Sequence, residues 1–442
     1  MIVIMSYSSY NMKFDIQVYT TQTSSRLAYA VDLVLGNILG LAYTITDSPD
    51  DSMPLINYSY DRSVGGIFIQ PEGLLFQKDI RMQEIWIAHL NGVPLFFQQP
   101  PEAGFQLDIF SFAFYLVTRY EEYLTLARDE HGRFVAESSL AYKHNFLDIP
   151  VVDIWAHRLG VTLKLLYPDL IIPEKKYDYL LTVDIEQPFE YKGKGLARNL
   201  GGLFMDFIRS NNPGKRFRCM TGSMKDSYDT YSYINKNADK YNCPVLYFFT
   251  TGDRSRYDKN ISPYTMCYKK LIKMLSKKHG VGLHSSYSSG NSVKLIIKEK
   301  DRLEDVTQQK ITKLRKHYLL LILPHTFQVI QTVGIMEDYT LGHIREAGFR
   351  AGIARSFKFY DLTREETSSL VLVPFQYMDA TFQKYKRYDP SEAIESVSRL
   401  IKRTKEVGGL FVSVWHNTSL TDKGEWRGWR QLFEYTLREQ QK

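Results

Sequence analysis

The chain has 442 residues, 44% hydrophobic and 24% charged, a composition typical of a folded globular protein with room for two or three domains. Its formal net charge of +7, from 56 basic and 49 acidic residues, is too small an excess to indicate nucleic-acid binding. Cys219, Cys243 and Cys267 lie too far apart for a disulfide framework or a zinc ribbon, which favours a reducing compartment.

The amino-terminal stretch, residues 1–17, has no basic segment before its short apolar run, so it does not resemble a signal peptide. No stretch of the chain reaches the roughly 18 apolar residues that a membrane span requires. We therefore expect a cytoplasmic protein without a transmembrane segment. The oligomeric state is not indicated by any feature of the sequence.

The first third of the chain contains short strand-like pieces at residues 65–70 and 92–97, without a repeating strand–helix pattern. Helical spacing of apolar residues predicts one helix over residues 108–124 and a second over residues 151–167. These features predict a small α+β amino-terminal domain of unknown function, residues 1–173.

A short polar linker, residues 173–176, precedes a change of pattern. From residue 177 onward, apolar strands alternate with amphipathic helices, which is typical of β/α units around a parallel sheet or barrel. The clearest unit is the last one, in which a helix over residues 391–409 is followed by a strand that ends at His416.

Several of the predicted strands end on residues that can titrate or bind a metal. These residues are Asp184 and Glu186, Asp253, His284, Asp338, Asp379 and His416. The carboxyl ends of the strands in a (β/α) barrel form one face, and that face builds the active site. A single such residue is readily explained as a solvated strand end, but packing does not explain the whole series.

Asp184 and Glu186 are two residues apart on a strand, so both side chains project to the same face. Two neighbouring carboxylates repel each other unless a proton or a cation lies between them. A divalent metal held by one carboxylate and by imidazoles would leave the other carboxylate as a general base. His284 suits a ligand, and His416 suits a second ligand or a general acid. The alternative is an exposed strand end whose carboxylates pair with nearby lysines.

Motifs throughout the chain resemble those of one family. In the first part they are FYLVTRYEEYL, DEHGRF and FLDIPVVDIW. In the second part they are LLTVDIEQPFEYKGK, VGLHSSYSS, RKHYL, GIMEDYTLGH, AGFRAGIARSF and VWHNTSL. Together they resemble the polysaccharide deacetylases, the NodB-homology carbohydrate esterases, and more closely a divergent two-domain bacterial subgroup with an uncharacterised amino-terminal domain. The resemblance implies an α/β fold with a distorted (β/α) barrel, residues 177–442, which hydrolyses an N-acetyl or O-acetyl group of a sugar with a divalent metal.

The resemblance also implies roles for the residues that match the family motifs. These are Asp184 as catalytic base, Glu186 as metal-binding carboxylate, His284 as metal ligand, Arg350 as the arginine that orients the base, Asp379 as the acid of the fourth motif and His416 as general acid. Zinc is the first expectation for the metal, with cobalt, manganese, iron and nickel as alternatives.

The sequence departs from the family pattern in two places. Ser288 stands where the second motif usually has a second histidine, so the third ligand must come from elsewhere. His317 is the first candidate and His325 the second, although His317 is equally well explained as a helix residue facing the barrel wall. The acids of the first motif are spaced D-x-E rather than adjacent, and the second acid is Glu186 rather than an aspartate.

Four aromatic residues next to the motifs, Tyr287, Tyr339, Phe357 and Trp415, are candidates for a sugar-binding platform or for barrel packing. The expected substrate is an N-acetylated carbohydrate, either a bacterial poly- or oligosaccharide or its precursor. A second hypothesis follows from the missing second-motif histidine. It is a catalytically inactive barrel that binds a glycan or a partner protein as a scaffold.

Overall fold

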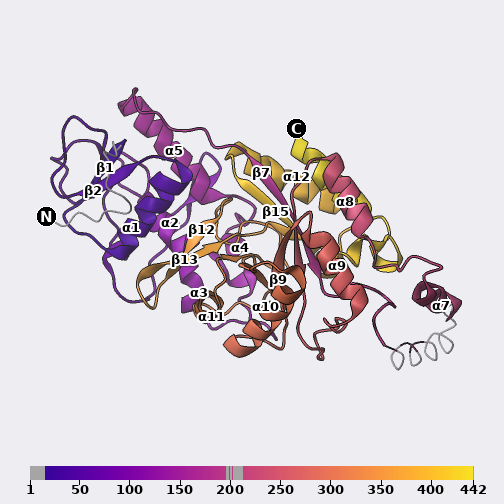
Figure 1. Ribbon diagram of the computed structural model, residues 1–442. Helices are drawn as coiled ribbons and strands as arrows, with labels where there is room; N and C mark the ends of the chain where they lie inside the picture. Colours follow the sequence, from indigo (N-terminus) through magenta and orange to yellow (C-terminus); the bar gives the residue numbers. More distant parts are fainter. Residues whose placement is uncertain (1–14, 196–198, 200–201, 203–212, 442) are drawn as a thin grey trace.

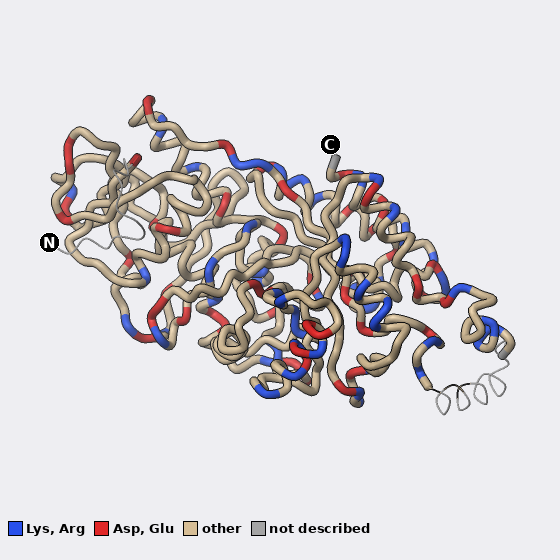
Figure 2. The backbone as a smooth tube through the Cα atoms, in the orientation of Figure 1, with Lys and Arg blue, Asp and Glu red and all other residues tan. Residues whose placement is uncertain are grey.

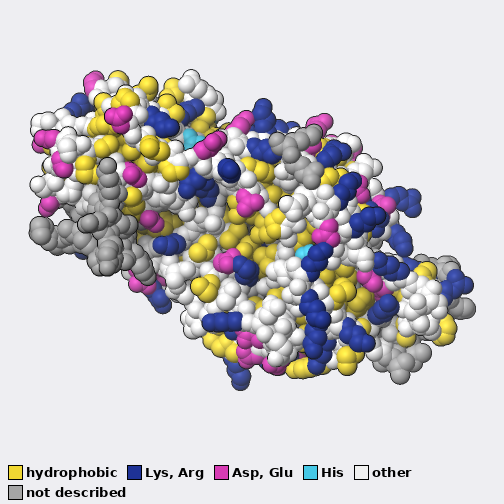
Figure 3. Space-filling model, turned by 45° about the horizontal axis from the view of Figure 1, so that its top comes forward, with side chains coloured by type: hydrophobic (Ala, Val, Ile, Leu, Met, Phe, Trp, Pro, Cys, Tyr) yellow, Lys and Arg dark blue, Asp and Glu magenta, His cyan; other side chains and the backbone are white. Residues whose placement is uncertain are grey.

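The computed structural model describes residues 15–195, 199, 202 and 213–441, so most of the amino-terminal stretch considered as a signal peptide lies outside the described residues. The amino-terminal part lies at one end of the molecule and the larger carboxyl-terminal part beside it (Figure 1). None of the described helices is long and apolar enough to cross a membrane. Acidic and basic residues are interspersed along the chain and over the face shown in Figure 3 (Figures 2 and 3).

The amino-terminal part is built on a small parallel sheet, with strand order β2-β1-β3-β4 in the described residues. Its strands are β1 (Ile16–Tyr19), β2 (Tyr43–Thr46), β3 (Leu55–Asn57) and β4 (Ile67–Phe68), and a hairpin of β5 (Ala88–Leu90) and β6 (Val93–Leu95) follows. Its helices include α1 (Ser25–Val31), α4 (Leu140–Lys143) and α5 (Val151–Leu166), with a π-helical turn η1 (Asp32–Ile38) after α1. The sheet is parallel, which the irregular sequence pattern of this region did not predict.

The helix predicted over residues 108–124 is two helices, α2 (Ile109–Val117) and α3 (Tyr120–Leu124). The break is at Arg119, which has a φ of 56° in the left-handed region. Its buried guanidinium donates hydrogen bonds to the carboxylates of Glu121 and Glu122 in the turn that follows. These two ion pairs fix a backbone conformation that apolar periodicity alone cannot reveal.

The carboxyl-terminal part contains a mainly parallel sheet, with strand order β12-β13-β11-β10-β9-β8-β7-β15-β14 in the described residues. The strands are β7 (Asp178–Ile185), β8 (Val245–Phe249), β9 (Gly280–Ser285), β10 (Lys313–Lys316), β11 (Glu337–Asp338), β12 (Phe357–Asp361), β13 (Glu366–Leu372), β14 (Tyr377–Met378) and β15 (Leu410–His416). The connecting helices include α8 (Tyr231–Lys240), α9 (Met266–Ser276), α10 (Val293–Thr307), α11 (His325–Thr332), α12 (Pro390–Glu406) and α13 (Arg430–Arg438), and α7 (Pro213–Thr221) precedes them.

One stretch of chain connects β13, the second strand from one edge of this sheet, with β14 at the other edge. β13 pairs with β11, and only a few residues later β14 pairs with β15. Between them, the backbone N–H of Phe375 donates to the carbonyl of Leu341, and that of Gln376 donates to the carbonyl of Val412. The sheet therefore curls into a barrel whose closing segment is irregular.

Along each strand, successive side chains alternate between the inside of the barrel and its outside. An inner apolar cluster includes Leu246, Phe248, Tyr339, Val373, Phe375, Met378, Val412 and Val414. Residues of opposite parity, such as Leu181, Val183 and Trp415, belong to the outer core, which also includes residues of the amino-terminal part. The two parts thus share one apolar core, and a division of the chain near residue 173 stays a prediction.

Candidate active site

Asp184 and Glu186 lie at the carboxyl end of β7, as the alternation of apolar residues predicts. Leu181, Val183 and Ile185 pack in the outer core. Residues of a strand alternate between its two faces, so Asp184 and Glu186 point to the inside of the barrel. Asp184 is 2% exposed, whereas about a third of the Glu186 side chain, 32%, is exposed.

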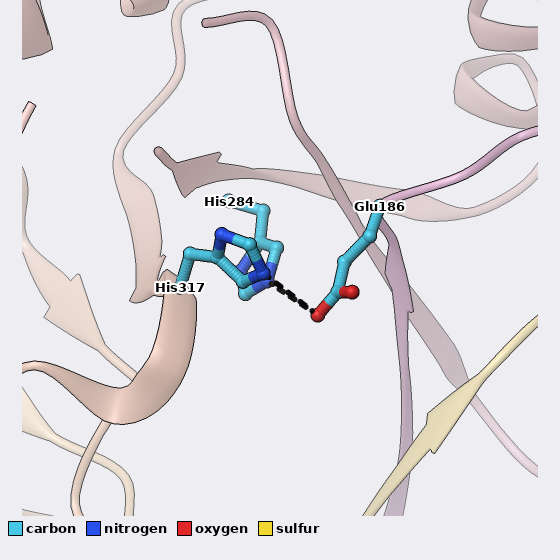
Figure 4. A group of neighbouring side chains, drawn as sticks. All are labelled: Glu186, His284 and His317. Atoms are coloured by element: carbon cyan, nitrogen blue, oxygen red, sulfur yellow. Dashed lines mark ion pairs between the residues drawn. The ribbon is translucent and has the colours of Figure 1, made fainter. Parts of the chain in front are cut away.

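Glu186, His284 and His317 form a cluster of possible metal ligands (Figure 4). One donor atom of each residue lies within 4.8 Å of the donor atoms of the other two. Oε1 of Glu186 is 3.1 Å from Nε2 of His317 and 3.7 Å from Nε2 of His284. The three residues come from the ends of β7, β9 and β10, so the barrel face brings them together as the sequence predicted.

Hydrogen bonds to the far side of each imidazole determine which nitrogen faces the cluster. Nδ1 of His284 is 3.1 Å from the carbonyl oxygen of Arg315, which can only accept a hydrogen bond. Nδ1 of His317 is 2.9 Å from a carboxylate oxygen of Asp258. In the neutral tautomer that these acceptors favour, Nε2 of each ring has its lone pair free. Nε2 of His284 is buried without a hydrogen-bond partner among the described residues, so the donor set fits a divalent metal.

Asp258 is a functional residue that the sequence did not reveal. Besides His317, its carboxylate accepts hydrogen bonds from the backbone N–H groups of Tyr287 and Ser288 and from the Ser288 hydroxyl. Ser288, in place of the usual histidine, thus helps to hold the carboxylate that orients His317. Asp258 lies in a loop after β8 without a motif, so no sequence signal connects it with residue 317.

The electrostatics of the cluster follow from its opposite charges. Burial alone would raise the pKa of the Glu186 carboxyl, but the positive charge of His317, whose Nε2 lies 3.1 Å from Oε1, holds that pKa well below its usual value. Burial opposes the charged form of His317, yet the carboxylates of Glu186 and Asp258 raise its pKa to about 9. A positively charged group next to the Glu186 carboxylate is therefore strongly stabilised at this site.

Asp184 is held by an arginine other than the predicted one. Nη1 of Arg315, on β10, donates to Oδ1 of Asp184 at 2.8 Å and to the hydroxyl of Thr182 at 2.9 Å. Arg315 is fully buried, and its Nε donates to the carbonyl of Tyr339. The other oxygen of Asp184, Oδ2, lies 4.0 Å from Nε2 of His284. Arg315 is in the RKHYL motif, for which the sequence analysis proposed a role only for His317.

The prediction that Arg350 orients Asp184 is wrong. The guanidinium of Arg350 donates to both carboxylate oxygens of Glu122, at 3.0 and 2.7 Å, and to the carbonyl of Gly342. Arg350 is 3% exposed and is therefore committed to the contact between the two parts of the molecule. The sequence could not distinguish these partners, since both are distant in the chain.

His416 and Asp379 form a hydrogen-bonded pair beside the cluster. Nδ1 of His416 lies 2.8 Å from Oδ1 of Asp379, and its Nε2 lies 3.3 Å from Oε1 of Glu186. Asp379 also accepts from the backbone N–H of His416 and from the hydroxyl of Ser419. Burial opposes protonation of His416, but the Asp379 carboxylate raises its pKa well above the usual value. β15 lies next to β7 on the side opposite to β8 and β9, so His416 flanks Glu186 from the other direction.

Three of the four aromatic candidates are packing residues, as the alternative reading allowed. Trp415 is fully buried on the outer face, where its ring packs against Phe433 and its Nε1 donates to the Tyr377 hydroxyl. Tyr339 is buried in the inner apolar cluster, and its hydroxyl donates a hydrogen bond to Glu337. Phe357 belongs to the outer core. The prediction that Tyr339 and Trp415 bind substrate is therefore wrong.

Tyr287 and His325 are the two sequence candidates that remain to be placed. Tyr287 is half-buried beside His131 and packs on Tyr257, with ring centroids 4.2 Å apart. His325 is exposed at the start of α11 and is not a member of the ligand cluster. Of the two candidates for a third ligand, the structure therefore brings His317 to Glu186 and His284.

A hollow of about 220 Å³ opens above the cluster. Its lining includes Asp184, Glu186, His284, His317, Tyr318, Tyr385, His416 and Trp426. A second hollow, of about 330 Å³, shares Gln187, Lys384, Thr418 and Trp426 with the first and continues past Glu190, Lys215 and Lys423. The two hollows together form an extended, polar cleft at the mouth of the barrel.

Comparisons with known proteins give limited similarity. Residues 16–168 match a family of unknown function, DUF7033, and a search of curated proteins found no match. A solved structure from Mycobacterium smegmatis, assigned to the polysaccharide deacetylases, matches with a TM-score of 0.38 and 16% identity over 60% of this chain and 84% of the other.

Two other solved structures match a similar share of this chain. Peptidoglycan deacetylase PdaC from Bacillus subtilis matches with a TM-score of 0.24 and 16% identity, over 61% of this chain and 99% of the other. A CE4 family pseudoenzyme from Bacillus anthracis matches with a TM-score of 0.29 and 12% identity, over 60% of this chain and 62% of the other. At these TM-scores and identities the similarities carry no argument about function, which rests on the geometry of the site.

Proposed function

We propose that this protein is a metal-dependent hydrolase that removes N-acetyl, or O-acetyl, groups from a bacterial poly- or oligosaccharide or its precursor. One observation carries the proposal. Two acid–base groups, Asp184 with Arg315 and His416 with Asp379, flank a three-donor cluster in one hollow. Amide hydrolysis needs such a pair, since one group removes a proton from water and another supplies a proton to the leaving amine. The motif resemblance to polysaccharide deacetylases supports the same reaction.

Glu186, His284 and His317 would hold the metal. A mixed nitrogen and oxygen donor set suits zinc and also cobalt, nickel, iron or manganese. When bound, such an ion polarises the acetamide carbonyl and makes a water molecule more acidic.

The chain's own residues supply the proton transfers. Asp184 acts as general base, and Arg315 orients its carboxylate through a hydrogen bond to Oδ1. His416 acts as general acid, because Asp379 fixes its Nδ1 side and leaves Nε2 facing the hollow. Each role follows from a hydrogen bond that orients the reacting side chain.

The extended cleft suits a saccharide of more than one unit. Trp426 lies at the junction of the two hollows, and Tyr318 and Tyr385 line the first. Aromatic faces of this kind bind the apolar faces of sugars, so these residues replace Tyr339 and Trp415 as the candidate platform. Lysine and glutamate side chains in the second hollow provide hydrogen-bonding partners for hydroxyl groups.

The test is acetate release from N-acetylated oligosaccharides by protein loaded with zinc or cobalt, together with analysis of the bound metal. Replacing Asp184→Asn is expected to reduce turnover by at least about 100-fold, because a general base typically contributes that much, and to leave about one metal ion per chain. Undiminished turnover in this variant would rule out the assigned base. Binding of a saccharide without any acetate release, with metal present, would favour the scaffold hypothesis instead.

A further inference from the structure

The amino-terminal part reaches the candidate metal centre through one turn. This turn, residues 129–133, connects the bridged residues Arg128 and Phe134. The carboxylate of Asp129 accepts hydrogen bonds from the backbone N–H groups of His131 and Arg133, and the backbone N–H of Gly132 donates to the Asp129 carbonyl. The turn is therefore rigid by its own hydrogen bonds.

Arg133 connects this turn to the barrel. Its Nε donates to Asp129 at 2.7 Å, and its Nη2 lies 2.6 Å from the same carboxylate. Its Nη1 donates, at 2.7 Å, to the carbonyl oxygen of Tyr318, which is 185 residues away in the chain. Arg133 is only 5% exposed, so this hydrogen bond is shielded from competing water.

Tyr318 follows the ligand His317 directly, in a turn with unfavourable backbone angles. Tyr318 has a φ of 59° and Leu319 a φ of 51°, both in the left-handed region. Residues other than glycine occupy that region at a cost of about 1–3 kcal/mol each, so surrounding contacts must hold them there. The hydrogen bond from Arg133 acts on the peptide group between these two residues.

Aromatic contacts reinforce the same junction. Nδ1 of His131 lies 3.1 Å from the hydroxyl of Tyr287. The centroid of the His131 ring is 5.1 Å from that of Tyr318 and 5.7 Å from that of Tyr257. Tyr318 in turn packs edge-on against the His317 ring, at 4.7 Å. The turn from the amino-terminal part therefore contacts Tyr318, which follows His317, and Tyr257, which precedes Asp258.

We infer that the amino-terminal part is a component of the metal centre, in which Arg133 is a positioning residue that holds the His317 turn in its ligating conformation. The inference rests on the proposed function only in requiring a metal at Glu186, His284 and His317. It assigns a specific structural role to the region that matches a family of unknown function. It also accounts for how a third ligand can be supplied from an irregular turn rather than from the second motif.

The experiment is a Co²⁺ titration of the full-length protein, followed by the visible absorption bands of the bound ion. Arg133→Gln is expected to raise the apparent dissociation constant by about 10–100-fold, as loss of a partner behind a ligand usually does, and to change the band intensities. Arg133→Lys should recover part of the affinity, because its ammonium group can still donate to the Tyr318 carbonyl. The matched control is Arg128→Gln, since the exposed Arg128 donates to the carbonyls of Thr125, Ala127 and Glu122 in the amino-terminal part and should leave the titration unchanged.

A wild-type titration curve and spectrum for Arg133→Gln would overturn the inference while leaving the metal centre intact. Failure of the wild-type protein to bind Co²⁺ would instead overturn the proposed function, and the inference with it. If Arg133→Gln does not fold, Asp129→Asn decides the question. That variant keeps the arginine but removes its carboxylate support, so an unchanged affinity would count equally against the inference.

Discussion

Replacing Glu122→Gln tests the reassignment of Arg350 from catalysis to the contact between the two parts of the molecule. Glu122 is 3% exposed and accepts hydrogen bonds from two buried arginines, Arg119 and Arg350. The neutral amide would leave these guanidinium groups with one fewer counter-charge in a dry environment. Breaking a buried ion pair in this way typically costs about 3–5 kcal/mol.

The pKa of Glu122 leads to a figure of similar size. Burial raises this pKa, but Arg350 and Arg119 together lower it from 4.5 to about 2. A difference of that size corresponds to about 3 kcal/mol. Since the folded pKa is the lower one, this stabilisation is complete above about pH 4.5 and is lost as the pH falls from there towards 2.

The assay is denaturant unfolding of both proteins at pH 7 and at several lower pH values, followed by tryptophan fluorescence and circular dichroism. The difference in unfolding free energy between wild type and Glu122→Gln should shrink as the pH falls below 4.5. The control is Asp239→Asn, which removes an ion pair with Lys278 at a site where both side chains are more than half exposed, and should cost less than about 1 kcal/mol. A Glu122→Gln variant within about 1 kcal/mol of the wild type at pH 7 would refute the reasoning, and Arg350 would again be available for a catalytic role.

Two further predictions concern residues whose roles the structure changed. Arg315→Gln should lower kcat by about 10–100-fold with little change in KM, since Asp184 loses the group that orients it, and steady-state kinetics on an N-acetylated oligosaccharide would show it. An unchanged kcat would mean that Asp184 needs no such support. Trp415→Phe should lower the unfolding free energy by about 1–3 kcal/mol through lost packing and a lost hydrogen bond to Tyr377, while KM stays the same. A KM that rises without a loss of stability would return Trp415 to the substrate site.

Local patterns in the sequence were sufficient for several strands of the barrel and for most of the ligand cluster. The runs around residues 178–185, 280–285 and 410–416 form β7, β9 and β15, which end as expected beside Glu186, His284 and His416. Strand periodicity and strand ends depend on neighbouring residues, so a single sequence reveals them. The same alternation could have excluded Trp415, because a residue next to an inward-facing histidine on a strand must face outward.

These local patterns do not identify interaction partners that are distant in the chain. Arg350 and Arg315 are both arginines near motif residues, and only their distances to Asp184 and Glu122 distinguish them. The support of His317 by Asp258 likewise arises from groups that meet only in the folded protein.

The sequence by itself determined the β/α architecture of the second part, the barrel face that carries the site, and the carboxylate and imidazoles at its strand ends. The tertiary structure decided which arginine holds the base, which histidine completes the donor set, and how the amino-terminal part joins the site. The physical reason is that periodicity and turn chemistry act over a few residues. Hydrogen bonds and ion pairs, by contrast, depend on distances of about 3 Å between groups that the sequence places more than a hundred residues apart.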